Sequence, residues 1–160
     1  MFVLGIDPGL SITGYGLVEG AHTPLAHRAG VIRTHTDLTP PERLAELHRG
    51  LTEVIVDTTP DVIALETVFT NRNLQTAISV GRASGVALLV AAQAGVPVFE
   101  YVPTAIKSAI TGDGAANKSQ IQQMVTRLLR LKDAPKPADA ADALAIALCH
   151  LRAARLEASR

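Results

Sequence analysis

The chain has no tryptophan and a single cysteine among its 160 residues, and only 3% of its residues are aromatic. One thiol cannot form an internal disulfide, which argues against a disulfide-stapled scaffold and favours a reducing, cytoplasmic location. The five histidines are scattered without H-x-x-x-H spacing, so we expect no zinc site. We see no leader segment and no apolar run of about 18 residues, the length of a membrane span, and expect no membrane partner.

Net charge is also absent, because 15 Lys and Arg balance 15 Asp and Glu. The charges are unevenly placed, however. Residues 1–66 carry four basic and nine acidic side chains, whereas residues 67–132 carry seven basic and two acidic ones. Such asymmetry predicts a localised basic face, the alternative being an ordinary solvated surface. The hydrophobic fraction of 48% is enough for one core.

The order of apolar segments predicts one α/β domain over residues 1–160, with a frayed tail at about 156–160. Short turns join strands expected at 2–6, 13–19 and 25–34, which favours an antiparallel meander. The later expected elements are a helix starting near Thr39, a strand at 61–66, a helix at 73–94, a strand at 95–101, and helices at 103–110, 117–131 and 138–155. Since a helix precedes it, strand 61–66 should lie parallel to the first strand.

Both buried strands end in a carboxylate, Asp7 and Glu66. If the strands are neighbours, these side chains meet at the carboxyl edge of the sheet, where open α/β sheets place their ligands. Adjacent buried carboxylates repel each other, and a divalent cation is the usual compensation. The competing interpretation is that Asp7 only begins the turn at Pro8-Gly9.

Asp139 and Asp142 lie three residues apart at the start of the last predicted helix and so share one face. That face continues into Ile146 and Cys149, which predicts that both acids point inward. The helix dipole alone explains an acid at Asp139 but explains Asp142 poorly. Carboxylates from three separate segments suit a site for two metal ions, about 3.5–4 Å apart, that promotes phosphoryl transfer.

Several stretches, in order over nearly the whole chain, resemble the RuvC family of bacterial Holliday junction resolvases. They are GIDPGLSITGYG, DVIALETVF, VGRASGVA, VFEY, KSQ and ADAADALAIA. The resemblance implies a ribonuclease H-like fold, with a mixed five-stranded sheet (antiparallel meander plus parallel strands) and helices on both faces. It also implies a homodimer that nicks four-way DNA junctions symmetrically with Mg²⁺ or Mn²⁺, leaves 5′-phosphate and 3′-hydroxyl ends, and works with RuvA and RuvB.

The family's four catalytic acids match the residues selected above: Asp7, Glu66, Asp139 and Asp142. The candidate DNA-binding residues are Phe69, Arg72, Asn73, Arg82, Lys107 and Lys118. Of these, the resemblance covers Phe69, Lys107 and Lys118, and it implies that the phenylalanine stacks on a base near the junction centre.

Phe69 lies in a polar loop just past Glu66, where an exposed aromatic ring can stack on an unpaired base for about 1–3 kcal/mol. The alternative is a ring folded back onto the core. The stretch GDGAANKS resembles a P-loop, but Asn117 replaces the required second glycine, so we expect no nucleotide site. Lys118, just inside a helix start, should instead meet a backbone phosphate. We find no role for Asp113.

Glycines carry two further expectations. Gly14 and Gly16 are interpreted as leaving room for the DNA backbone beside the metal ions. Gly81 and Gly85 lie inside a predicted helix, where each costs about 1 kcal/mol relative to alanine. They therefore predict a close backbone approach, either to the sheet or to a second subunit.

Three other functions compete with a junction resolvase. A sugar kinase or actin-like ATPase needs two such domains and lacks the Asp-x-x-Asp helix start. A catalytically inactive junction-binding module has no need of all four acids. A ribonuclease H-like nuclease acting on RNA or a hybrid remains open.

Overall fold

The computed structural model describes residues 1–20, 23–67 and 73–159, in which five strands form one mixed sheet in the order β3-β2-β1-β4-β5. The strands are β1 (Phe2–Asp7), β2 (Ile12–Glu19), β3 (Leu25–Arg33), β4 (Val62–Glu66) and β5 (Val98–Tyr101). The first three pair antiparallel as a meander, and β1–β4 and β4–β5 pair parallel. The predicted sheet and the parallel placement of the 61–66 strand are therefore confirmed.

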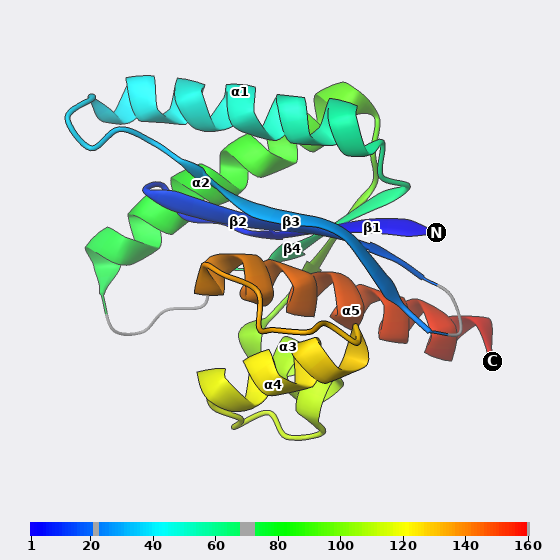
Figure 1. The fold of residues 1–160 in the computed structure, drawn as a ribbon. Coiled ribbons are helices and arrows are strands. Elements are labelled where there is room, and N and C mark those ends of the chain that lie inside the picture. The colour runs from blue at the N-terminus through cyan, green and yellow to red at the C-terminus, as the bar shows by residue number, and fades with distance from the viewer. Residues whose placement is uncertain (21–22, 68–72, 160) are drawn as a thin grey trace.

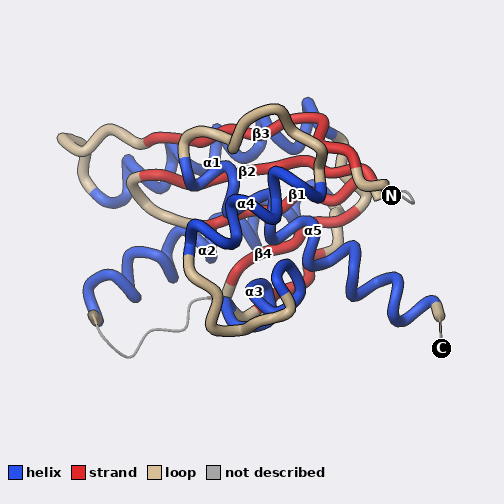
Figure 2. The backbone as a smooth tube through the Cα atoms, turned by 60° about the horizontal axis from the view of Figure 1, so that its bottom comes forward, coloured by secondary structure: helices blue, strands red, loops and turns tan. Residues whose placement is uncertain are grey.

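Helices cover both faces of this sheet (Figure 1). They are α1 (Pro40–Thr58), α2 (Leu74–Ala94), α3 (Pro103–Thr111), α4 (Lys118–Leu128) and α5 (Ala138–Ala158). One face carries α1 and α2, and the other carries α5, with α3 and α4 packed outside it. The turned view brings α3 and α4 to the front, on the side of the sheet that α5 covers (Figure 2). From one side to the other, the layers are thus α1 with α2, the sheet, α5, and the outer pair α3 and α4.

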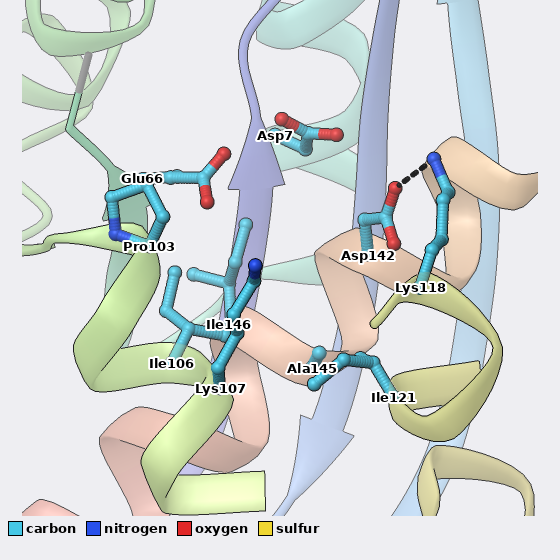
Figure 3. A pocket seen from close by; sticks show the side chains of 10 residues that line it. All are labelled: Asp7, Glu66, Pro103, Ile106, Lys107, Lys118, Ile121, Asp142, Ala145 and Ile146. Atoms are coloured by element: carbon cyan, nitrogen blue, oxygen red, sulfur yellow. Dashed lines mark ion pairs between the residues drawn. The ribbon is translucent and has the colours of Figure 1, made fainter. Parts of the chain in front are cut away.

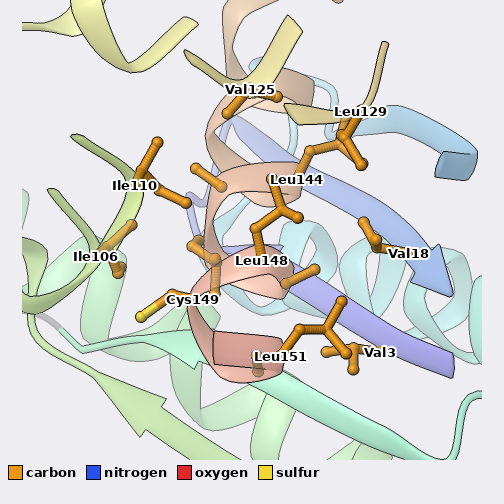
Figure 4. Close-up of a cluster of buried hydrophobic side chains, with 14 of the residues drawn as sticks. Val3, Val18, Ile106, Ile110, Val125, Leu129, Leu144, Leu148, Cys149 and Leu151 are labelled. Atoms are coloured by element: carbon orange, nitrogen blue, oxygen red, sulfur yellow. The ribbon is translucent and has the colours of Figure 1, made fainter. Parts of the chain in front are cut away.

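The apolar core is split by the sheet into two clusters. Alternation along β1 sends Leu4 and Ile6 toward α1 and α2, and Val3 toward α5. The second cluster, between the sheet and α3, α4 and α5, is shown in Figure 4. β1 is buried on both faces because it lies at the centre of the sheet, as its continuous apolar run predicted.

The alanine-rich helix α5 lies against β1 and β2 at backbone distance. A Cβ atom on Gly5 would overlap the carbonyl oxygen of Ala143, and one on Gly14 would overlap that of Asp139. A Cβ on Gly16 would lie 2.8 Å from the Leu144 side chain. The expectation that these second-strand glycines leave room for DNA is therefore wrong, because the space they leave is filled by α5.

Gly81 and Gly85 lie on the exposed side of α2. A Cβ atom on either would meet nothing within 4 Å, so a close approach of the sheet at these two glycines is wrong, and the alternative approach of a second subunit stays a prediction. α5 continues through Ala158, into the tail expected to fray at 156–160, and that fraying also stays a prediction. The α4 helix ends at Leu128 instead of 131, because Arg130 adopts a left-handed conformation with φ 51°.

The close contact between β1 and α5 predicts a large cost for a single methyl group. We expect Gly5→Ala to destabilise the fold by about 3 kcal/mol, since the new Cβ meets backbone atoms that cannot move aside. Gly114→Ala is the control, because its Cβ would meet nothing closer than 3.5 Å. Urea unfolding followed by circular dichroism measures both, and equal stability of the two variants would contradict the prediction.

Candidate active site

The carboxyl ends of β1 and β4 bring Asp7 and Glu66 side by side. The two strands are parallel neighbours, and their register pairs Ile6 with Leu65, the residues just before the two acids. The first turns of α5 bring Asp142 to the same place, and Figure 3 shows the three carboxylates facing one pocket. The interpretation of Asp7 as a turn former alone is therefore insufficient.

This pocket has a volume of about 270 Å³ and two unlike walls. The acids and two lysines, Lys107 on α3 and Lys118 on α4, form its polar side. The apolar side consists of Pro103, Ile106, Ile121, Ala145 and Ile146. An apolar wall beside charged groups lowers the local dielectric constant on that side, which strengthens electrostatic interactions with a bound ligand.

Asp139 lies beside the pocket and is not among its lining residues. Its backbone carbonyl packs against Gly14 of β2, and its half-buried side chain is close enough for its charge to raise the pKa of Asp7. The structure thus brings the four sequence-predicted acids into one neighbourhood, with three of them facing the pocket and Asp139 at its margin.

Burial, followed by the charges of Glu66, Asp142 and Asp139 in that order, raises the pKa of Asp7 to about 8. Burial also raises the pKa of Glu66, but its hydrogen bond with Asp7 acts in the opposite direction. That bond raises the pKa of Asp7 and lowers that of Glu66, so Asp7 is the partner that keeps the shared proton.

Two lysines offset part of this negative charge. The Lys118 Nζ lies 2.8 Å from Asp142 Oδ2, and this hydrogen-bonded pair raises the pKa of Lys118. Lys107 forms no ion pair with a described residue, but its charge lowers the pKa of Glu66. Four acids against two lysines still leave an excess of negative charge.

The donor set fits a divalent cation, because hard carboxylate oxygens and uncompensated negative charge are what Mg²⁺ and Mn²⁺ require. Among the described residues, no three acidic, histidine or cysteine side chains are already gathered as a complete ligand group. Asp142 is paired with Lys118 in this structure, so ion binding by Asp142 would exchange that ion pair for a metal–oxygen bond.

Of the predicted DNA-binding residues that the structure describes, two line the pocket and two do not. Lys107 and Lys118 line it directly. Asn73 caps α2, where its Oδ1 accepts a hydrogen bond of 3.2 Å from the Thr76 amide, and Arg82 is exposed on α2 away from the pocket lining. The expectations for Phe69 and Arg72 lie outside the described residues.

The turn between β1 and β2 is held by contacts that the sequence did not reveal. The Thr13 hydroxyl, 1% exposed, donates to the Gly9 carbonyl at 2.7 Å. Arg43 of α1 donates to Ser11 Oγ at 2.7 Å and to Thr34 Oγ1 at 2.9 Å. These contacts fix the backbone that follows the first acid. The only sequence signal was a threonine inside an apolar strand, which is too common to predict a role.

A sequence model of the family described as "Crossover junction endodeoxyribonuclease RuvC" matches residues 3–150. The chain belongs to the RuvC family. The crossover junction endodeoxyribonuclease RuvC of Salinispora arenicola (strain CNS-205) is 50% identical over 155 residues, covering 94% of this chain and 87% of that protein. RuvC of Desulfitobacterium hafniense (strain DSM 10664 / DCB-2) is 49% identical over 159 residues, covering 98% and 95%.

Solved structures agree with this membership. Thermus thermophilus RuvC superposes with a TM-score of 0.91 at 38% identity, covering 98% of this chain and 97% of that one. The same bacterium's RuvC in complex with a Holliday junction substrate gives 0.92 at 40% identity, with coverages of 98% and 96%. A yeast mitochondrial Holliday junction resolvase, 17% identical with a TM-score of 0.69, shares the fold. The predicted ribonuclease H-like architecture is therefore confirmed.

The raised pKa of Asp7 predicts that its ionisation opposes folding. Because the folded value, about 8, exceeds the ordinary value of 3.8, the carboxyl's stabilising contribution is complete below pH 3.8 and is lost as pH rises toward 8. In EDTA at pH 8, Asp7→Asn should be more stable than the wild type by about 1–3 kcal/mol, less than the full shift because the pocket is open to water. Near pH 4 the difference should vanish.

Urea unfolding at both pH values measures this difference. Asp37→Asn, which changes an exposed carboxylate, is the matched control and should show no such pH-dependent gain. Added Mg²⁺ should stabilise the wild type more than Asp7→Asn, since the variant lacks one carboxylate ligand. An Asp7→Asn variant less stable than the wild type at pH 8 in EDTA would contradict the prediction.

Proposed function

We propose that this chain is a metal-dependent endonuclease that resolves four-way DNA junctions by paired, symmetric nicks, leaving 5′-phosphate and 3′-hydroxyl ends. The observation that carries the proposal is the convergence of acids from β1, β4 and α5 on one pocket, in a chain of the RuvC family. The similarity to Thermus thermophilus RuvC in complex with a Holliday junction substrate supports the choice of DNA.

We infer that Asp7, Glu66, Asp139 and Asp142 hold two divalent cations, Mg²⁺ or Mn²⁺. Bound ions of this kind activate water and stabilise the charge that develops during phosphodiester hydrolysis. The carboxylates come from two strand ends and a helix start, so their backbone is rigid and the ligands are positioned before the substrate arrives.

The two lysines have separate tasks in this proposal. Lys107 forms no ion pair with the described residues and faces the pocket, so it is free to contact the phosphate that is cut. Lys118 neutralises Asp142 in the absence of ions and becomes available to a neighbouring phosphate when Asp142 binds metal. Phe69, Arg72, Asn73 and Arg82 follow Glu66 in the chain, and we propose that they lead the DNA toward α2.

Removing a pocket carboxylate tests the proposal. Asp7→Asn, Glu66→Gln and Asp142→Asn should each lower cleavage of a synthetic four-way junction by at least about a thousandfold, because each loses a metal ligand. Junction affinity in EDTA should not fall and should rise by less than about threefold, since the acids repel phosphate rather than attract it. Single-turnover cleavage and gel-shift titration measure the two quantities.

The same assay separates the competing activities. Asp37→Asn is the control and should cut like the wild type. Equal cutting of a linear duplex or an RNA–DNA hybrid by the wild type would replace the junction resolvase with a general ribonuclease H-like nuclease. Residual cleavage near the wild-type rate in Asp7→Asn would overturn the assignment of the acids.

An apolar stripe on α2 supports a homodimer. Leu74, Ile78, Leu88 and Leu89 are 75%, 42%, 38% and 51% exposed, and helical spacing puts them on one face with Gly81 and Gly85. A Cβ atom built on either glycine would meet nothing within 4 Å in the described part of the chain, which leaves room for a partner helix to approach closely. We propose that α2 packs on α2 of a second copy, which would supply the second site needed for symmetric nicks.

The composition of α2 also meets a length and hydropathy criterion for a membrane span. An 18-residue stretch of this helix has a mean hydropathy of 1.4, and 22% of that stretch is buried. This is weak evidence, because a helix that pairs with another subunit satisfies the same criterion, and the stripe is interrupted by Arg82. We therefore keep the proposal of a dimer without a membrane partner.

A charge in the stripe should separate the subunits. We expect Leu89→Glu to convert a dimer into a monomer and to abolish paired nicking, since burying an unpaired carboxylate at the interface is unfavourable. Leu156→Glu, at a leucine 69% exposed on the last turns of α5, is the control and should remain dimeric. Sedimentation velocity measures the oligomeric state, and vesicle flotation measures membrane binding. A monomeric wild type, or flotation with vesicles, would contradict the dimer.

Two further proposals concern the cellular setting. We propose that the chain acts in the cytoplasm, because its proposed substrate is chromosomal DNA and its one cysteine, Cys149, is a buried free thiol. From the family resemblance we also propose that it acts with RuvA and RuvB, which process the same junctions.

A further inference from the structure

A second surface lies at the far end of the helix that carries Lys118. Residues 114–132 contain no Asp or Glu and include four basic residues. Beyond Lys118, the other three are Arg127, Arg130 and Lys132, and all three are exposed. With the polar uncharged residues Gln122, Gln123 and Thr126, they line a shallow groove of about 570 Å³, which we call the α4 groove.

The cations of the α4 groove are not neutralised by the described part of the fold. None of Arg127, Arg130 and Lys132 forms an ion pair with a described residue. Among the described lining residues, Asp133 is the only carboxylate, and it follows the last of the three cations. Because α4 buries Ile121 and Val125 on its opposite face, its polar face and these charges are open to a ligand.

Arg130 occupies a backbone position that glycine would adopt with less conformational strain. Its φ of 51° ends α4, and the Leu131 amide bonds back to the Thr126 carbonyl at 2.9 Å, as in a helix stop that ordinarily uses glycine. An arginine in this left-handed conformation is strained by its Cβ atom. Its side chain makes no ion pair with the described residues that would offset the strain, which indicates a role toward an external ligand.

We propose that Arg127, Arg130 and Lys132 bind the phosphate backbone of a duplex arm of the junction. The α4 groove begins beside the catalytic pocket, because Ser119 lines the groove and the preceding residue, Lys118, lines the pocket. Arg130 follows Lys118 by twelve residues, which at the rise of an α-helix is about 18 Å. This is the length of about five base pairs of duplex DNA. The inference rests on the proposed function, since the arm is that of the DNA that is cut.

The lining chemistry favours phosphate over a carboxylate-rich protein. Glutamine amides and a threonine hydroxyl next to arginines match the mixed neutral and charged donors that contact phosphate and sugar oxygens. Such contacts carry no base specificity. They anchor the arm while the pocket selects the phosphate to be cut.

The test compares Arg127→Gln, Arg130→Gly, Lys132→Gln and the triple variant with the full-length wild type. Fluorescence anisotropy in EDTA measures affinity for a four-way junction and for a linear duplex over a range of salt concentrations. Each single change should weaken binding about threefold and reduce the slope of log affinity against log salt by about one. The control is Arg49→Gln, an exposed arginine on α1 across the sheet from α4, which should match the wild type (Figure 1).

Arg130→Gly separates a ligand role from a structural one. Glycine relieves the left-handed strain, so the melting temperature should rise by about 2–4 °C while affinity and salt slope fall. Unchanged affinity and an unchanged salt slope in the triple variant would overturn the proposal, even if Arg130→Gly melts at a higher temperature. An acidic protein would then be the ligand of the α4 groove. If the wild type binds the junction no more tightly than the linear duplex, the proposed function fails. The salt slopes measured on the linear duplex still test whether the α4 groove binds phosphate.

Discussion

The close approach of α5 to the glycine-bearing strands β1 and β2 is the constraint on which the rest of the structure depends. It requires glycine at positions 5 and 14, where any Cβ would overlap the helix backbone. It also requires a helix surface of small residues, and Ala141, Ala143 and Ala147 are fully buried there. The same approach sets the height of Asp139 and Asp142 above the strand ends, so core packing positions the acids.

A second consequence is electrostatic. Bringing carboxylates to the end of a buried strand raises the pKa of Asp7 to about 8 and leaves negative charge that the fold offsets only in part. The ion pair between Lys118 and Asp142 supplies one compensation, and a divalent cation fits the remainder. A site that destabilises the ion-free protein and is relieved by ligand is the expected compromise between stability and activity.

The two faces of the sheet differ in charge as well as in packing. The acidic excess of residues 1–66 includes four carboxylates on α1: Glu42, Glu46, Glu53 and Asp57. The basic residues between positions 107 and 136 lie on α3, α4 and the segment following α4, across the sheet from α1 (Figure 1). A chain without net charge can therefore present a basic surface beside its pocket, which suits the nucleic acid substrate of the proposed function.

The sequence by itself predicted the antiparallel meander, the parallel direction of β4 and, on the condition that β1 and β4 are neighbours, the gathering of the four acids. It did so because buried strands, turns and helix starts have strong local patterns, and chain connectivity restricts how such elements pair. The roles of Phe69 and the other DNA-binding candidates stay predictions, since no contact of the described residues tests them.

Only the tertiary structure decided what the glycines of β2 make room for, how Lys118 is paired, and where α4 ends. The first two depend on contacts between segments far apart in the chain, Gly14 with Asp139 and Lys118 with Asp142. The end of α4 depends on the left-handed backbone conformation of Arg130, a residue type that does not signal a helix stop. A glycine in a strand has the same local signature whether a helix or DNA fills the space above it. Packing distances between elements, which local propensity does not encode, make that distinction.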